Sequence, residues 1–139
     1  MHLDRMTAMA RLVAADHGVL ATINRTGVPD VVPACFAVVG DVLAIPIDQV
    51  KPKRSTALGR LGNLERDPRA TFLVERWDAD DWSRLWWVRV KLLRVAVPPA
   101  EVAALEGALR GRYPQYAKTT FVELLAFRVE AIGGWEAAT

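Results

Sequence analysis

Short apolar runs separated by turn residues cover much of this chain, and they constrain its fold more than any other feature. Gly18 to Asn24 alternates weakly and is rich in β-formers, and the turn after it contains Gly27, which is free to adopt a positive φ. Runs of this kind predict strands. The expected strands are Gly18 to Asn24, Val31 to Val39, Val42 to Ile47, Arg69 to Trp77, Leu85 to Val97 and Phe121 to Ile132. For the last run, a helix over Val122 to Ala126 is an open alternative. The first three strands are joined by tight turns and predict an antiparallel meander.

Three further segments have the periodicity or the end signals of helices. Gly18 is expected to stop the first of them. The expected helices run from Asp4 or Thr7 to about Ala15, from Ser55 to about Glu65, and from Pro99 to about Arg112. Six or seven strands with two or three helices predict a mainly β fold, a small barrel with flanking helices. Because no linker, repeat or low-complexity stretch interrupts the pattern, we expect residues 1–139 to form a single domain.

The apolar segments are too short for a membrane span. The longest, Val31 to Val39, has nine residues and contains Pro33. The N-terminus lacks the basic, apolar and small-residue order of a secretory signal, so a cytoplasmic protein without membrane insertion is expected. The lone Cys35 excludes an internal disulfide and is expected to be an inert, buried thiol.

Positive charge is concentrated in one segment. The net charge is only +2, yet Lys51 to Arg69 holds six basic residues against Glu65 and Asp67. One patch of this kind does not indicate a nucleic-acid surface. It lies where a helix is expected to begin, and a helix N-terminus offers free N–H groups and a positive dipole end. The segment is therefore a candidate receptor for a phosphate group.

The helix from Ser55 is predicted to have one core-facing side and one polar side. At 100° per residue, its leucines fall on one stripe and face the core. Thr56, Arg60 and Asn63 share another face, where a hydroxyl, a guanidinium and an amide are suited to hold a phosphate. A solvated face with charges placed for solubility explains the same pattern, and the sequence does not decide between the two.

The usual catalytic machinery is missing from the sequence. His2, His17 and Cys35 cannot supply a zinc-type cluster, so no metal site is predicted. Asp78, Asp80 and Asp81 are better explained as a polar loop than as a cation site. There is no phosphate-binding Gly-rich motif. If the protein is an enzyme, a cofactor is expected to bring the reactive group.

The order of several motifs resembles the pyridoxamine 5′-phosphate oxidase-like superfamily. These motifs are Leu20-Ala-Thr-Ile-Asn-Arg-Thr-Gly27, Val32-Pro-Ala-Cys-Phe36 and Arg60-x-x-Asn63-Leu64-x-x-Asp67-Pro68. Within that superfamily, the sequence is more similar to the small actinobacterial members that use the deazaflavin F420. The segments that carry this likeness are Val50-Lys-Pro-Lys53, Arg60-Leu61 and Leu85-Trp-Trp-Val-Arg-Val90.

The resemblance implies a split β-barrel and a homodimer with two cofactor sites at the subunit interface. It implies cofactor-phosphate ligands at Lys53 and Arg60, supported by Lys51, Thr56 and Asn63. The ring system would be lined by Pro33, Ala34 and Cys35, mainly through backbone groups. Pocket or interface positions are implied for Trp77, Trp86, Trp87 and Arg89, with packing in a dimer core as the alternative for the tryptophans. Arg89, in mid-strand, is expected to have an anionic partner or to reach solvent.

The resulting hypothesis is an F420-dependent oxidoreductase that passes a hydride to a small unsaturated or aromatic acceptor. An FMN-binding oxidoreductase of the same fold is the first alternative, because FMN also offers a phosphate and a tricyclic ring. A non-catalytic carrier of a flavin or haem-like ligand is the second, because no side chain stands out as a proton donor.

Overall fold

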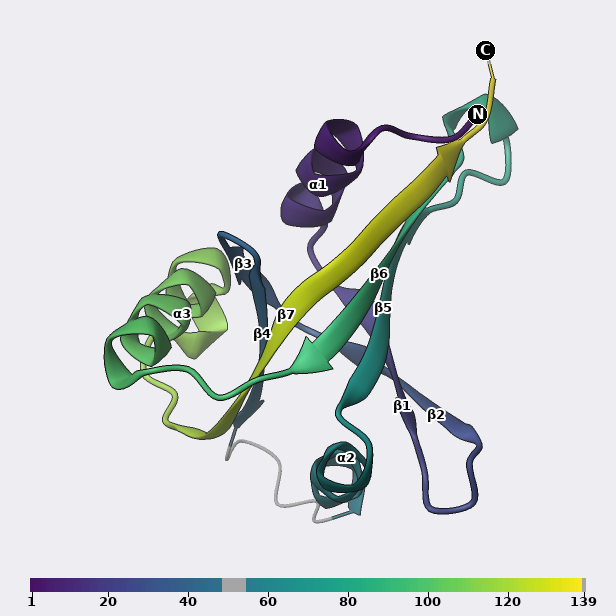
Figure 1. Cartoon of the computed structure of the whole chain (residues 1–139). Coiled ribbons are helices and arrows are strands. Elements are labelled where there is room, and N and C mark those ends of the chain that lie inside the picture. Colours follow the sequence, from purple (N-terminus) through teal and green to yellow (C-terminus); the bar gives the residue numbers. More distant parts are fainter. Residues whose placement is uncertain (49–54, 139) are drawn as a thin grey trace.

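One curled antiparallel sheet with the strand order β2-β1-β5-β6-β7-β4-β3 organises the fold (Figure 1). The computed structural model describes residues 1–48 and 55–138, without the side chains of residues 48, 55–58 and 122. The strands are β1 (Gly18–Ile23), β2 (Pro29–Ala34), β3 (Ala37–Val39), β4 (Val42–Asp48), β5 (Arg69–Arg76), β6 (Trp86–Arg94) and β7 (Phe121–Glu136). The helices are α1 (Arg5–Ala14), α2 (Ser55–Arg66) and α3 (Pro99–Arg112), with short 3-10 turns η1 (Trp82–Arg84) and η2 (Pro114–Tyr116). The predicted mainly β fold with helices on its flanks is confirmed, and the last run is a strand.

The sheet closes on itself because of a short crossover. β2 and β3 lie at opposite edges of the sheet, yet only Cys35 and Phe36 separate them in the chain. Consecutive Cα atoms are about 3.8 Å apart, so the link from Ala34 to Ala37 spans at most about 11 Å. The two edges must therefore approach each other, which curls the sheet into a half-barrel.

This crossover corrects the sequence prediction for residues 31–39. The run was expected to form one strand within a meander, but β2 pairs with β1 whereas β3 pairs with β4. The prediction was wrong because the run is apolar throughout, and apolarity alone does not show where a chain changes from one sheet edge to the other.

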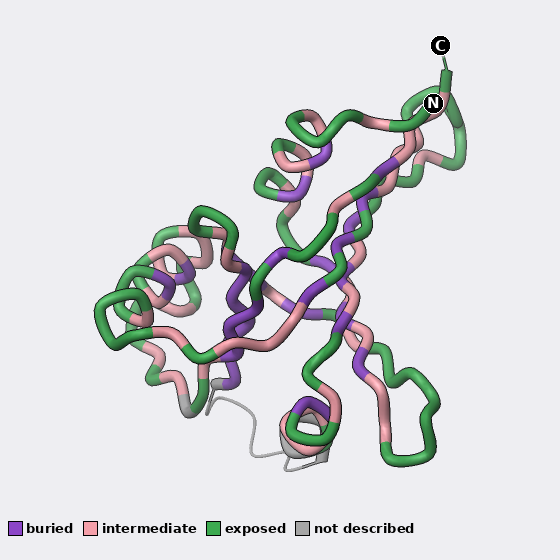
Figure 2. The backbone as a smooth tube through the Cα atoms, in the orientation of Figure 1, coloured by how far each residue is buried: buried purple, intermediate pink, exposed green. Residues whose placement is uncertain are grey.

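The concave side of the sheet holds the core (Figure 2). Phe36 and Phe72 meet there with ring centroids 4.8 Å apart, and both are fully buried. Helix α1 adds Ala8 and Leu12 to this cluster. A second, smaller cluster lies under α3 and contains Ala37, Ala44, Leu105, Leu109 and Ala126.

Local signals explain the ends of the first elements. The Asp4 side chain accepts a hydrogen bond from the Thr7 amide at 2.7 Å, so Asp4 caps α1. Gly27 has a φ of 83°, as predicted for the turn between β1 and β2. The expectation that Gly18 stops α1 is wrong, because α1 ends at Ala14 and Gly18 opens β1. Gly18 is needed for space, since a Cβ atom there would lie 2.4 Å from the Phe72 ring.

Candidate functional site

The convex side of the sheet, here called the outer face, carries several of the predicted site residues. Directly paired residues point to the same side of a sheet, so the register defines its rows. One row contains Pro33, Val19, Leu73, Arg89 and Gly133, and the next contains Val31, Ala21, Thr71, Lys91 and Ala131. No residue of either row is buried, and Val31 is 64% exposed. The described part of one protomer thus leaves an apolar, mildly cationic sheet face uncovered.

At one end of the outer face, called the tryptophan end, four of the predicted residues come together. Trp77, Trp86, Trp87 and Arg89 line one pocket of about 340 Å³. Trp77 also meets Trp82 edge to face, with centroids 6.0 Å apart, and Trp87 is paired across the strands with Trp135. All five tryptophans of the chain therefore gather at this end.

The positive charge in this pocket comes from Arg89. Its side chain is exposed, and its guanidinium lies 5.3 Å from the centre of the Trp87 ring. None of the ion pairs between described residues includes Arg89. The prediction that Arg89 reaches solvent is confirmed, and the guanidinium is accessible to a ligand.

A larger hollow of about 580 Å³ lies on the same face, nearer to α2. Its polar lining includes Arg69, Thr71 and Lys91 together with Thr22 and the acid Glu130, between apolar walls that include Ile23 and Leu93. Sequence reasoning missed Arg69, Thr71 and Lys91. The signal was the period of two along β5 and β6, since residues that alternate with buried Phe72, Val74, Val88 and Val90 must face outwards.

Arg69 is already partnered within the chain. It donates to both carboxylate oxygens of Asp67, at 3.0 and 2.7 Å. Hydrogen bonds from the Arg69 side chain and backbone lower the pKa of Asp67 to about 2. Among the described residues, Lys91 makes a long hydrogen bond of 3.5 Å to Thr71. Its ammonium group is therefore more available to a ligand than the guanidinium of Arg69.

The structure gives Asn63 an internal position. Asn63 is 3% exposed, and its amide nitrogen donates to Thr22 at 3.0 Å and to Asp30 at 2.9 Å. Its amide oxygen accepts a hydrogen bond from Arg66 at 2.7 Å. The expectation that Asn63 shares an accessible helix face with Arg60 is wrong, because the turn that buries Leu64 also directs Asn63 against β1. The hydrogen bonds of its amide hold α2 against β1 and β2.

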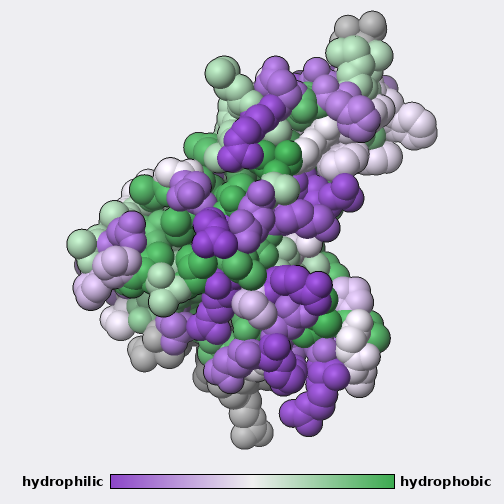
Figure 3. Space-filling view, viewed as in Figure 1, coloured by the Kyte–Doolittle hydropathy of each residue, from purple (hydrophilic) through white to green (hydrophobic). Residues whose placement is uncertain are grey.

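The remaining predicted phosphate ligands receive no geometric test. Lys51 and Lys53 lie outside the described residues, as does the side chain of Thr56. Arg60 is half-buried on α2. In the space-filling view, hydrophilic side chains dominate the surface around α2 (Figure 3). A phosphate site at this end remains a prediction.

The residues predicted to line a ring system lie at the crossover. Pro33 is exposed on the outer face, Ala34 is 8% exposed, and Cys35 is half-buried. Strand β2 ends and strand β3 begins at this short link. Contact of these residues with a cofactor is not tested by the structure.

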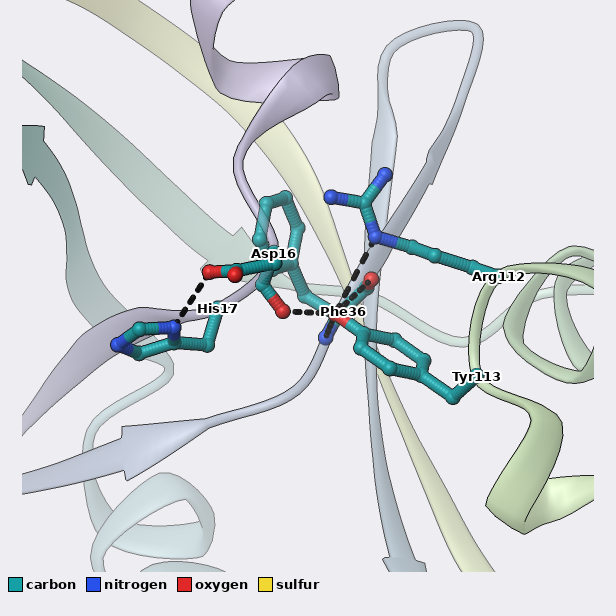
Figure 4. A network of polar contacts seen from close by, with 5 residues as sticks. All are labelled: Asp16, His17, Phe36, Arg112 and Tyr113. Carbon is teal, nitrogen blue, oxygen red and sulfur yellow. Dashed lines mark hydrogen bonds and ion pairs between the residues drawn. The ribbon is translucent and has the colours of Figure 1, made fainter.

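Tyr113, which sequence reasoning did not single out, fixes the crossover (Figure 4). Its hydroxyl accepts from the Phe36 amide at 3.1 Å and lies 3.1 Å from the Phe36 carbonyl and 2.8 Å from that of Asp16. The neighbouring Arg112 donates to this hydroxyl and to the Val13 carbonyl. The end of α3 therefore holds the crossover and the end of α1 together. A contact between segments so far apart in the chain leaves no local sequence signal.

Among the described residues, the predicted site residues on α2 and those at the tryptophan end form two groups at opposite ends of the molecule (Figure 1). The eight residues of β5 separate α2 from the tryptophan end. At about 3.3 Å per residue this is roughly 25 Å. The two groups do not meet within one protomer.

Two kinds of feature are missing from the part of the chain that the structure describes. No three metal-ligating side chains come together there. No helix in that part has the length and apolar character needed to cross a bilayer.

The likeness to known proteins is structural. No family model matches the sequence, and no curated protein matches it. An FAD-binding protein from Mesorhizobium loti superposes with a TM-score of 0.72 at 18% identity, over 100% of this chain and 97% of that one. A haem-binding protein from Mycobacterium smegmatis gives 0.72 at 16% identity, over 97% of this chain and 55% of that one.

A third structure, from Corynebacterium glutamicum, is provisionally named a pyridoxamine 5′-phosphate oxidase. It superposes with a TM-score of 0.60 at 14% identity, over 98% of both chains. Identities this low establish the fold alone. The chain therefore has the split-barrel fold shared by these flavin-binding and pyridoxamine 5′-phosphate oxidase-like proteins, which confirms at the level of the fold the resemblance seen in the sequence.

Proposed function

We propose that this chain is a cytoplasmic, homodimeric oxidoreductase that binds F420 and reduces a small unsaturated or aromatic acceptor. The observation that carries the proposal is the uncovered outer face of a sheet that has α2, with Arg60, at one end and the tryptophan end at the other. A fold that also occurs in FAD-binding proteins supports the cofactor class.

Assembly into a homodimer explains why the α2 end and the tryptophan end lie apart within one protomer. In a two-fold dimer the same patch meets itself, so residues at one end of the patch face residues at the other end in the partner. If the outer faces pack antiparallel, the α2 end of each protomer meets the tryptophan end of its partner. Two composite sites follow, and apolar residues of the outer face such as exposed Val31 and half-buried Leu73 become covered.

Each group then has a defined task. The positive charges of Lys51, Lys53 and Arg60 hold the cofactor phosphate, and the backbone of residues 33–35 lines the ring. Tyr113 keeps that backbone in place through the crossover. Bound F420 supplies the hydride, and the tryptophan pocket orients the acceptor and excludes water.

The residues of the larger hollow fit an anionic, largely planar cofactor. Apolar walls at Ile23 and Leu93 suit a ring, while Lys91 and Thr71 offer donors at the rim. The excess of Lys51, Lys53, Arg54 and Arg66 favours F420 over FMN, because F420 has the longer acidic tail. The second candidate is a flavoprotein that uses FMN or FAD, and it is favoured by the named functions of the structural neighbours.

Titration with F420 and, separately, with FMN tests the cofactor. Since all five tryptophans lie at one end, quenching of their fluorescence should report a ligand bound there. We expect tighter binding of F420, followed by acceptor-dependent oxidation of the reduced form. Tighter binding of FMN would favour the second candidate, binding without turnover would favour a carrier, and binding of neither would refute the cofactor site.

Charge-removing variants locate the phosphate. Lys53→Ala and Arg60→Ala should each weaken cofactor binding by about 1.5–3 kcal/mol, the range for charged hydrogen bonds. Lys118→Ala, which removes an exposed charge from the loop before β7, serves as the control and should bind as the parent does. Equal affinities for all the variants would show that the phosphate binds elsewhere.

The dimer has its own test by light scattering. Val31→Glu puts a charge on the outer face and should weaken dimerisation at least tenfold, about 1.4 kcal/mol. Val28→Glu is the matched control, because Val28 is 54% exposed but lies in the turn outside the sheet. If both variants dimerise as the parent does, the outer face is not the interface.

A further inference from the structure

We propose that the pocket at the tryptophan end binds a planar, conjugated compound with one carboxylate, and that Arg89 recognises this carboxylate. The proposal rests on the proposed function in one respect, since it names the chemical class of the acceptor. Binding of such a compound does not itself require a cofactor.

The shape of the pocket selects planar ligands. Its volume of about 340 Å³ lies near the lower end of the usual range for small-molecule sites. Three of the residues that line it, Trp77, Trp86 and Trp87, are tryptophans, and Trp87 projects to the same side of β6 as Arg89. Aromatic walls favour flat conjugated molecules, which stack offset or meet the rings edge to face.

The charge of the pocket selects an anion. Arg89 has no carboxylate partner among the described residues, and its guanidinium lies over the ring of Trp87, 5.3 Å from the ring centre. A cation–π contact leaves the N–H donors of the guanidinium without an anionic acceptor. A ligand carboxylate supplies that acceptor, and the planar guanidinium binds it through two parallel hydrogen bonds.

An acidic residue that also lines the pocket limits the negative charge of the ligand. Glu75 lines the same pocket and is paired across the strands with Trp87. It forms no ion pair with Arg89 within 4.0 Å in the described structure. Its carboxylate repels a second negative group, so the pocket suits a monoanion better than a dianion.

Isothermal titration calorimetry with two ligands of the same shape tests the charge. Trans-cinnamate carries the carboxylate, and trans-cinnamamide is its neutral counterpart. We expect cinnamate to bind about tenfold more tightly at pH 7.5, as a single charged hydrogen bond provides. Equal affinities would overturn the proposal.

Matched variants assign the effect to Arg89. Arg89→Met should abolish the preference for cinnamate while leaving the affinity for cinnamamide near that of the parent. Lys118→Met is the control, because Lys118 is exposed in the loop before β7 and lies outside this pocket. It should keep the preference. A preference that survives in Arg89→Met, or is lost equally in Lys118→Met, would overturn the proposal.

A second pair of variants tests the aromatic wall. Trp77→Ala should weaken both ligands, whereas Trp82→Ala should not, because Trp82 contacts Trp77 without lining the pocket. Light scattering on every variant separates binding from assembly. If Arg89→Met loses the dimer together with the affinity for both ligands, Arg89 serves the interface and the proposal fails. Failure of F420 binding with cinnamate discrimination intact would refute the proposed function alone.

Discussion

The α2 end and the tryptophan end differ in whether their polar side chains have partners within the chain. At the α2 end, the amide of Asn63 is hydrogen-bonded to Thr22, Asp30 and Arg66. At the tryptophan end, Arg89 has no carboxylate partner in the described structure. A polar residue in a promising motif is thus a ligand candidate only when the fold leaves its hydrogen-bonding groups unused.

Asn63→Ala should produce the largest change in stability. It leaves the buried hydroxyl of Thr22 without its donor, removes one of the two side-chain hydrogen bonds to the carboxylate of Asp30 and opens a small cavity, which together cost about 3 kcal/mol. Urea unfolding measures this loss. The control is Glu65→Ala, an exposed position on the same helix, which should change the free energy of unfolding by less than about 0.5 kcal/mol. An unchanged midpoint for Asn63→Ala would show that α2 is not held by this amide.

Gly134→Ala should have the next largest effect and tests the packing of the tryptophan end. A Cβ atom there would lie 2.7 Å from the Trp87 carbonyl and 2.9 Å from Leu3, which overpacks the end of β7. We expect a loss of about 2 kcal/mol. At Gly133, in contrast, a Cβ atom meets nothing within 4 Å, so Gly133→Ala should be nearly neutral. Thermal unfolding of the two variants should differ clearly, and equal melting temperatures would contradict the close packing.

The smallest effect concerns acid stability at the α2 end. Hydrogen bonds from Asn63 first, and then from Asn24, lower the pKa of Asp30 below its ordinary value. A lowered folded-state pKa stabilises the protein above the unfolded-state pKa of about 3.9, and this stabilisation is lost as the pH falls through the folded-state value.

The stability difference between the parent and Asn63→Ala should therefore narrow as the pH falls below about 4. Other acid-sensitive pairs, such as Asp67 with Arg69, are the same in both proteins and cancel in this difference. Urea unfolding at neutral and acid pH measures it. A difference that is independent of pH would contradict the bond between Asn63 and Asp30.

Local features of the fold could be read from the sequence. The Asp4 cap, the positive φ of Gly27 and the strands at residues 18–23 and 42–48 depend on neighbours within a few positions. The strand break at Cys35 and Phe36 could not be read, because it is set by pairing with distant strands. Gly18 was misjudged for the same reason, since the reason for a glycine there is the ring of Phe72.

The candidate site was predicted unevenly. Trp77, Trp86, Trp87 and Arg89 could be named from the resemblance to the superfamily, and they do line one pocket. Asn63 was misplaced, because a helical wheel gives the angle of a side chain but not the element packed against it. The spacing between the two ends was beyond prediction, since it depends on register across β1, β5 and β6.

The two-sided pairing of β7 has a consequence for synthesis of the chain. β7 pairs with β4 on one side and β6 on the other, and it leaves the ribosome after the other six strands of this sheet. Until then, both neighbours carry an open row of N–H and C=O groups that can join another chain. A nascent protein that stalls or is cleaved before residue 121 retains these two open edges, so its recovery depends on protection by chaperones more than on the stability of the completed fold.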